Sequence, residues 1–216
     1  MKMPPDMVLF DCDGVVVDSE PVTARALCAN LNRHGLAITQ PELVDLFLGG
    51  TMPGLAKQAR AMGTDLPETW VADAYSELFG ILAAEVEAIA GISQVLDRLD
   101  AAGIPFAIGS NGPHRKMQIT LGRTGLIERF QGRIYSREDV PNPKPAPDVY
   151  LKAAADAGIA PDRCVVIEDS PSGARAGVAA GMQCFGFAGE TPAERLTPIC
   201  DRVFASMQEL PDLLGV

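Results

Sequence analysis

Four short apolar runs constrain the fold of this chain more than any other feature. Each run is apolar at every position, whereas a strand with one face in water alternates apolar and polar residues. Strands that are buried on both faces are typical of parallel sheets covered by helices on both sides. The four predicted strands are Met7–Phe10, 105–108, 164–167 and 184–187.

Amphipathic stretches separate these strands, and several of them end at a glycine. The predicted helices are 92–102, 115–124, 147–157 and 171–180, and they are followed by Gly103, Gly125, Gly158 and Gly181. A glycine directly after a helix is the usual C-terminal cap. From about residue 93 onward the chain therefore repeats an α/β pattern, which predicts a doubly wound, Rossmann-like parallel sheet.

The stretch from about residue 20 to residue 89 breaks this alternation. It shows helical periodicity over 22–34, 42–47, 54–62 and 68–88, and it contains no convincing strand. We interpret it as an all-helical cap domain inserted after the first strand. The predicted α/β core comprises residues 1–17 and 90–216, and the predicted helical insert comprises residues 18–89.

Composition excludes several kinds of partner. The chain has 216 residues, enough for one sizeable core and a smaller insert. Its 18 Lys and Arg against 28 Asp and Glu give a formal charge of −10. A field of this sign repels nucleic acids and anionic membrane surfaces, so we expect neither as a partner. Any anionic substrate must be held by local positive charge.

Cysteine usage and the N-terminal residues indicate the compartment. The five cysteines show no C-x-x-C spacing and no neighbouring histidine pair, which favours reduced thiols over a disulfide framework or a zinc site. The apolar run before Asp11 is too short for the core of a signal peptide or for a membrane span. We expect a cytoplasmic, monomeric protein.

Three of the predicted strands end in residues that can do chemistry. Asp11 and Asp13 follow the first strand, the run 110–112 (Ser-Asn-Gly) follows the second, and Glu168 and Asp169 follow the third. An isolated Asp-x-Asp-Gly segment is more often a structural Asx turn. Ligands of open α/β sheets, however, bind outside the carboxyl ends of the strands. The recurrence of such residues at three strand ends predicts one common site.

These residue types suit phosphoryl transfer. Asp11 and Asp169 can share a hard divalent cation through oxygen ligands, which indicates Mg²⁺ in a chain with two histidines. Lys144, between two prolines that limit its freedom, adds a second cation. Such cations neutralise a phosphoryl group and let a carboxylate approach it. Asp11 would attack phosphorus to form an aspartyl phosphate, and Asp13 would protonate the leaving oxygen and then deprotonate water.

The order of the motifs resembles the haloacid dehalogenase superfamily over nearly the whole chain. The matching runs are DCDGV at 11–15, SNG at 110–112, KPAP at 144–147, EDSPSG at 168–173 and AAGM at 179–182. More narrowly, the chain resembles the β-phosphoglucomutase-like phosphatases, whose helical cap is inserted after the first strand. Within that group, the residues around Asp11 and Ser110 are most similar to bacterial 6-phosphogluconate phosphatases.

The resemblance implies a role for each matching residue. Asp11 is implied as nucleophile and metal ligand, and Asp13 as acid/base and as a metal ligand through its backbone carbonyl. Asp169, with Glu168 beside it, is implied to complete the metal site. Lys144 is implied to balance charge at the phosphate and to help catalysis. The implied phosphoryl-binding residues of the run 110–112 are Ser110, which is also implied to be catalytic, Asn111 and Gly112.

The predicted activity is Mg²⁺-dependent hydrolysis of a small phosphorylated metabolite, either a sugar phosphate or a sugar-acid phosphate such as 6-phosphogluconate. A sugar phosphomutase is the main alternative, although the resemblance implies cationic cap residues in mutases where this chain has the uncharged run 48–53. Gly50 and Thr51 in that run are the expected substrate contacts of the cap, because glycine permits close approach of backbone to ligand. A non-catalytic binding protein is less consistent with the sequence, since no catalytic carboxylate is missing.

Overall fold

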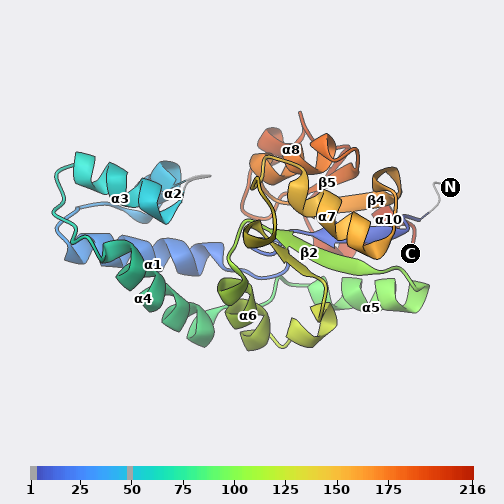
Figure 1. The fold of residues 1–216 in the computed structure, drawn as a ribbon, viewed down its shortest axis with the longest axis horizontal. Coiled ribbons are helices and arrows are strands. Elements are labelled where there is room, and N and C mark those ends of the chain that lie inside the picture. The colour runs from blue at the N-terminus through green and yellow to red at the C-terminus, as the bar shows by residue number, and fades with distance from the viewer. Residues whose placement is uncertain (1–3, 48–50) are drawn as a thin grey trace. The chain divides into compact units, whose positions relative to one another are not determined.

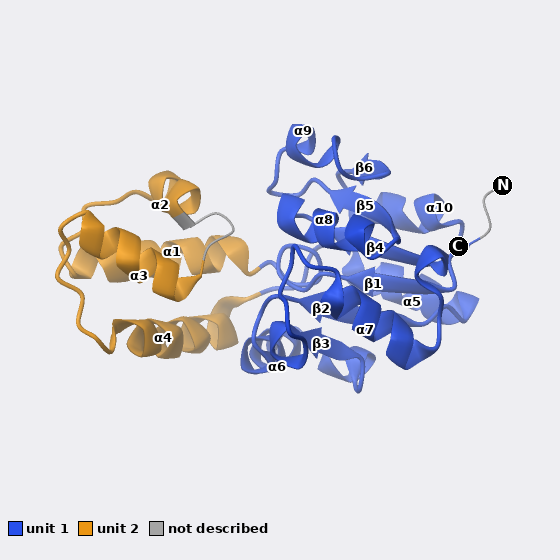
Figure 2. Cartoon of the chain, turned by 45° about the horizontal axis from the view of Figure 1, so that its top comes forward, with its two compact units in different colours: residues 1–18, 87–216 blue, residues 19–86 orange. Residues whose placement is uncertain are grey.

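A computed structural model describes residues 4–47 and 51–216 of the chain. Contacts between residues divide it into two compact units, residues 1–18 with 87–216 and residues 19–86 (Figure 2). We predicted that the insert would extend to residue 89, but residues 87–89 are hydrogen-bonded to the first unit. The N–H of Asp18 donates to the carbonyl of Glu87 (2.9 Å), and that of Ile89 donates to the carbonyl of Val16 (3.0 Å).

The first unit contains the predicted parallel sheet. Its order is β3-β2-β1-β4-β5-β6, and every neighbouring pair is parallel. The four predicted strands are confirmed as β1 (Met7–Phe10), β2 (Phe106–Ser110), β4 (Cys164–Glu168) and β5 (Gln183–Phe187). The prediction missed the two edge strands, β3 (Ile134–Ser136) and β6 (Arg202–Phe204), which have three residues each and are only partly buried.

Helices cover both faces of this sheet, as α7 (Asp148–Ala157) and α5 (Ile92–Ala102) on opposite sides of β2 show in Figure 1. Met7 and Leu9 of β1 pack in a cluster with Val149 and Ala153 of α7. Side chains alternate along a strand, so the buried Val8 and Phe10 of β1 point to the opposite face. The helices that pack around the sheet are α5 (Ile92–Ala102), α6 (His114–Arg123), α7 (Asp148–Ala157), α8 (Pro171–Ala179), α9 (Ala193–Leu196) and α10 (Leu210–Leu214).

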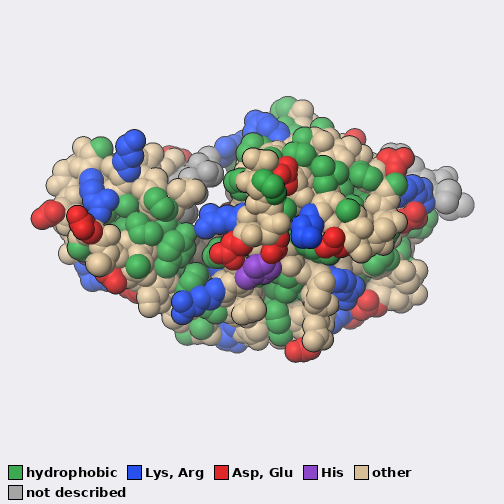
Figure 3. Space-filling view, viewed as in Figure 1, with side chains coloured by type: hydrophobic (Ala, Val, Ile, Leu, Met, Phe, Trp, Pro, Cys, Tyr) green, Lys and Arg blue, Asp and Glu red, His purple; other side chains and the backbone are tan. Residues whose placement is uncertain are grey.

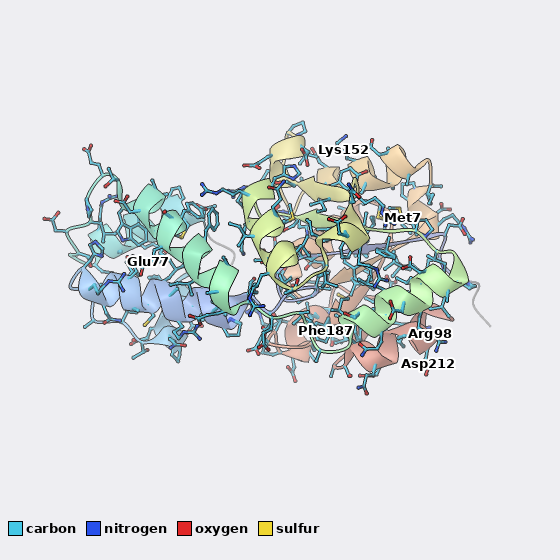
Figure 4. The ribbon with its side chains drawn as sticks, turned by 90° about the horizontal axis from the view of Figure 1, so that it is seen from below. Met7, Glu77, Arg98, Lys152, Phe187 and Asp212 are labelled. Carbon is cyan, nitrogen blue, oxygen red and sulfur yellow. The ribbon has the colours of Figure 1, made fainter. Side chains whose placement is uncertain are left out.

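The second unit consists of four helices. They are α1 (Glu20–Arg33), α2 (Gln40–Phe47), α3 (Met52–Ala61) and α4 (Trp70–Glu85). Trp70 is buried, and its indole N–H donates to Asn30 Oδ1 at 2.8 Å. Asn30 in turn donates to Glu77, which is labelled in Figure 4. This network ties α4 to α1, so the expected helical character of the insert is confirmed.

Acidic and basic side chains are interspersed on the face shown in Figure 3, despite the net negative charge. In the described part of the chain, no helix is long and apolar enough to cross a membrane.

Candidate active site

The groups predicted at strand ends lie at one edge of the sheet. Asp11 directly follows β1, Ser110 is the last residue of β2, and Glu168 is the last residue of β4. β2 and β4 are the two neighbours of β1. Because all three strands are parallel, their carboxyl ends lie side by side, where open α/β sheets bind ligands.

The turn after β1 places Asp169 against the backbone that follows Asp11. Gly14 has a φ of +79°, a conformation that residues with a side chain rarely adopt, and its N–H donates to the carbonyl of Val17 at 2.8 Å. A Cβ on Gly14 would lie 2.8 Å from Cγ of Asp169. Glycine therefore allows both the sharp turn and the approach of the carboxylate of Asp169, a residue that is buried.

Lys144 is held at both ends. Its Nζ donates to Asp11 Oδ1 at 2.6 Å and to Glu168 Oε1 at 2.7 Å, and it lies 4.6 Å from the centre of the Tyr150 ring. The side chain of Asn111 makes two hydrogen bonds to the backbone of Lys144. Its Oδ1 accepts from the Lys144 N–H at 2.9 Å, and its Nδ2 donates to the Lys144 carbonyl at 3.2 Å. Asn111, predicted as a phosphoryl ligand, thus positions the lysine loop.

Protein donors occupy both carboxylate oxygens of Glu168, whose predicted role as a metal ligand stays a prediction. Oε1 accepts from Lys144 and from the Tyr150 hydroxyl (3.1 Å), and Oε2 accepts from the N–H and the hydroxyl of Ser170 (2.9 Å each). The residue is fully buried. A Cβ on Gly173 would overlap its carboxylate. In this structure Glu168 is the anion that pairs with Lys144 beside Asp11.

Burial and charge shift the pKa of both members of the central pair. Burial raises the pKa of Asp11 to about 7; the charge of Lys144 opposes this rise, and those of Glu168 and Asp13 add to it. Burial alone would lower the pKa of Lys144, but the charges and hydrogen bonds of Asp11 and Glu168 outweigh it and raise the pKa. The lysine therefore remains charged beside the nucleophile candidate.

Asp13 and Ser110 lie on the same side of Gly112. A Cβ on Gly112 would be 3.2 Å from Ser110 Oγ and 3.5 Å from Asp13 Oδ2. The Gly112 N–H donates to Ser110 Oγ at 2.9 Å, which leaves the hydroxyl proton of Ser110 available for a ligand. Lys116 Nζ lies 2.7 Å from Asp13 Oδ1. The structure thus brings Asp13, Ser110 and a second lysine together.

The donors around Asp11 fit a divalent cation that takes few protein ligands. Across residues 4–47 and 51–216, no three side chains of His, Cys, Asp or Glu converge as a ready metal site. The predicted set needs only two carboxylates, Asp11 and Asp169, with the main-chain carbonyl of Asp13. The space that Gly14 leaves for the Asp169 carboxylate fits this arrangement. Oxygen donors that leave room for waters are what Mg²⁺ prefers.

Thr51 and Gly50 are the two substrate contacts predicted in the helical unit. Thr51 is the N-cap of α3, where its hydroxyl accepts from the Gly54 N–H at 3.2 Å. This bond accounts for the threonine by helix capping alone. Gly50 lies outside the described residues. Both remain predictions as substrate contacts.

Three residues that support the site were not predicted. Tyr150 and Ser170 donate hydrogen bonds to the carboxylate of Glu168, and Lys116 forms an ion pair with Asp13. A Ser-Pro-x-Gly sequence at 170–173 is a helix-start signal, and Ser170 indeed caps α8 by accepting from the Gly173 N–H at 3.0 Å. Its second bond, to Glu168, has no local sequence signal.

Comparison with known proteins agrees with the predicted superfamily. Residues 5–181 match the family model described as haloacid dehalogenase-like hydrolase, so the chain belongs to this hydrolase family. Hexitol phosphatase A of Escherichia coli K12 is 36% identical over 208 residues, which cover 94% of this chain and 91% of that protein. The 6-phosphogluconate phosphatase of the same organism is 29% identical over 210 residues, which cover 96% of this chain and 94% of that protein.

A solved structure shares the fold. The HAD family hydrolase of Deinococcus radiodurans R1, crystallised with bound phosphate and sodium, is 35% identical, with a TM-score of 0.84 over 99% of this chain and 96% of that one. These matches confirm the predicted superfamily, fold class and enzyme class, a phosphatase.

Proposed function

We propose that this phosphatase is Mg²⁺-dependent and hydrolyses a small sugar or sugar-acid phosphomonoester through an aspartyl phosphate on Asp11. The observation that carries the proposal is the buried contact of Asp11 with Lys144, backed by Glu168. A carboxylate held by an ammonium group at the carboxyl end of a parallel strand can receive a phosphoryl group whose charge the same cation neutralises.

Each side chain then has a definite task. Lys144 takes Oδ1 of Asp11, so the other carboxylate oxygen forms the bond to phosphorus while the bond from phosphorus to the ester oxygen breaks. Asp13 gives its proton to that leaving oxygen, and it later takes a proton from the water that attacks the aspartyl phosphate. Ser110 donates its hydroxyl proton to a phosphoryl oxygen, because its own oxygen already accepts from Gly112.

We assign the metal to Asp11, Asp169 and the main-chain carbonyl of Asp13. Mg²⁺ held by these residues would supply positive charge that offsets the charge of the phosphoryl oxygens. Asp169 is suited to this because its carboxylate lies against the Asp13–Gly14 backbone. We leave Glu168 out of this set, because four protein donors already bond to its carboxylate oxygens.

The relatives narrow the substrates to be tested. One is named for 6-phosphogluconate and the other for hexitol phosphates, and this chain covers more than nine-tenths of each. Both names point to open-chain or acidic six-carbon phosphates. We propose that the helical unit, by way of Thr51 and residue 50, selects among such substrates, as caps do in the family that the sequence resembles.

A phosphate-release assay tests the proposal. We expect the purified chain with Mg²⁺ to release inorganic phosphate from 6-phosphogluconate or a hexitol 6-phosphate. EDTA should abolish the release, and added Mg²⁺ should restore it. Asp11→Asn should lower turnover by roughly 10⁴-fold or more, as loss of a nucleophile does. Undiminished turnover of Asp11→Asn or in EDTA would refute the nucleophile or the metal, respectively.

A second assay separates hydrolysis from the mutase alternative. Incubation with β-glucose 1-phosphate and a trace of the bisphosphate can be followed by ³¹P spectra. We expect inorganic phosphate as the product. Formation of glucose 6-phosphate faster than inorganic phosphate would show that the mutase interpretation is correct.

A further inference from the structure

Two cysteines face each other beside strand β5, outside the candidate active site. Cys184 lies on β5, and Cys200 lies in the segment between α9 and β6. Their sulfur atoms are 3.8 Å apart, and both thiols are free. A Cβ on Gly186 would come within 3.0 Å of Cys200 Sγ, so the glycine in β5 makes the space into which the thiol fits.

Two hydrogen bonds join the segment of Cys200 to β5, and a third lies within the Cys200 segment. The N–H of Cys184 donates to Asp201 Oδ2 at 2.8 Å, and the N–H of Asp201 donates to the carbonyl of Cys184 at 2.8 Å. The N–H of Cys200 donates to the carbonyl of Leu196 at 2.9 Å. A disulfide has an S–S bond of about 2.05 Å, so the sulfurs need to approach by roughly 1.8 Å. The fold has therefore brought the pair most of the way together.

The surroundings distinguish a reactive thiol from a resolving one. Cys184 is buried, whereas Cys200 is partly exposed and open to a small oxidant. The hydrogen bond between the two sulfur atoms lowers the pKa of Cys200. The thiolate is the form of cysteine that reacts. By contrast, Cys12, Cys28 and Cys164 are buried, and burial raises the pKa of Cys164 to about 11.

We propose that Cys184 and Cys200 form a redox-active thiol pair, which hydrogen peroxide converts into an intrachain disulfide. The Cys200 thiolate attacks one peroxide oxygen, the O–O bond breaks, and Cys200 sulfenic acid and hydroxide form. The Cys184 sulfur then displaces the sulfenic oxygen, which leaves as water with the thiol proton. Two thiols are oxidised, peroxide is reduced to water, and a dithiol reductant reverses the change.

Thiol counting and peptide mapping of the full-length chain test this proposal. The reduced protein, in EDTA near pH 8, is treated with a small excess of peroxide and then unfolded in denaturant. We expect two of the five thiols to disappear, the chain to lose the mass of two hydrogen atoms, and digestion to yield a peptide that links Cys184 to Cys200. Dithiothreitol should restore all five thiols. This readout is independent of phosphatase activity.

Two variants complete the test. Cys200→Ser should lose the intrachain disulfide, whereas Cys164→Ser, which removes a buried cysteine, should still form it. Wild-type mapping decides the question even if a variant fails to fold. A disulfide between other cysteines, linkage only between chains, or oxidation of Cys200 to sulfinic acid without linkage would each overturn the proposal.

Discussion

Replacing Lys144 with methionine should destabilise the protein strongly, because it removes the cation between two buried carboxylates. The Lys144 side chain is 3% exposed, and its Nζ lies 2.6 Å from Asp11 and 2.7 Å from Glu168. Removing one partner of a buried ion pair costs about 3–5 kcal/mol. At roughly 2–4 °C per kcal/mol for a chain of this size, Tm should fall by roughly 6–20 °C near pH 8.5.

The loss should depend on pH in a definite direction. With Lys144 present, the pKa of buried Asp11 is already raised to about 7. Without the ammonium group it should rise further, while in the unfolded chain it stays near about 3.9. A carboxyl group whose folded pKa is raised stabilises the fold fully below its unfolded pKa, and this stabilisation is lost as pH rises through the folded pKa. The gap between wild type and Lys144→Met should therefore widen as pH rises above about 7.

Urea unfolding followed by circular dichroism, near pH 6 and near pH 8.5, measures both effects. EDTA in the buffer prevents a bound metal from replacing the lost charge. Lys152→Met is the matched control, because Lys152, labelled in Figure 4, forms an exposed pair with Asp156 at 3.1 Å. It should cost less than about 0.5 kcal/mol. An unchanged unfolding free energy for Lys144→Met near pH 8.5, or the same gap at both pH values, would refute the reasoning.

Three further substitutions separate catalysis from support. Asp13→Asn should slow hydrolysis of an alkyl phosphate by about 10²–10⁴-fold, the usual contribution of proton transfer, and an unchanged kcat would remove Asp13 from the mechanism. Ser170→Ala should lower the unfolding free energy by about 1–2 kcal/mol, because it removes the N-cap of α8, which accepts from the Gly173 N–H, and a hydroxyl donor to Glu168. Urea unfolding identical to wild type would contradict this. Gly14→Ala should cost about 1–3 kcal/mol through overpacking at a positive φ, and a stability equal to wild type would show that the turn relaxes.

The central strands were predictable because an unbroken run of apolar residues indicates a strand that is buried on both faces. Residues 7–10 and 164–167 are apolar at every position, and the structure buries them on both faces. The edge strands gave no such signal: Ile134–Ser136 and Arg202–Phe204 include polar or partly exposed positions, as an edge does when one side meets water. Their pairing depends on the neighbouring strand rather than on local sequence.

The site was predictable in its residues but only partly in their contacts. Position at a strand end brings Asp11, Ser110 and Glu168 to one edge, and this follows from topology. Which of these carboxylates pairs with the lysine depends on side-chain directions. The partners of Glu168 are Lys144, Tyr150 of α7 and Ser170 at the start of α8, and no local sequence signal indicates them. Only packing between distant segments could reveal that assignment.

The charge at the site makes phosphate binding and metal binding interdependent. The site contains more carboxylates than ammonium groups. The four carboxylates are those of Asp11, Asp13, Glu168 and Asp169, and the two ammonium groups are those of Lys116 and Lys144. A phosphate dianion brought to this site meets a net negative charge, which opposes binding. One divalent cation removes that excess. We therefore expect inorganic phosphate to raise Tm more in Mg²⁺ than in EDTA, because at a fixed concentration the ligand that binds the folded state more tightly stabilises it more. Equal stabilisation by phosphate in both buffers would show that the two lysines suffice to hold the anion, and that the metal acts elsewhere.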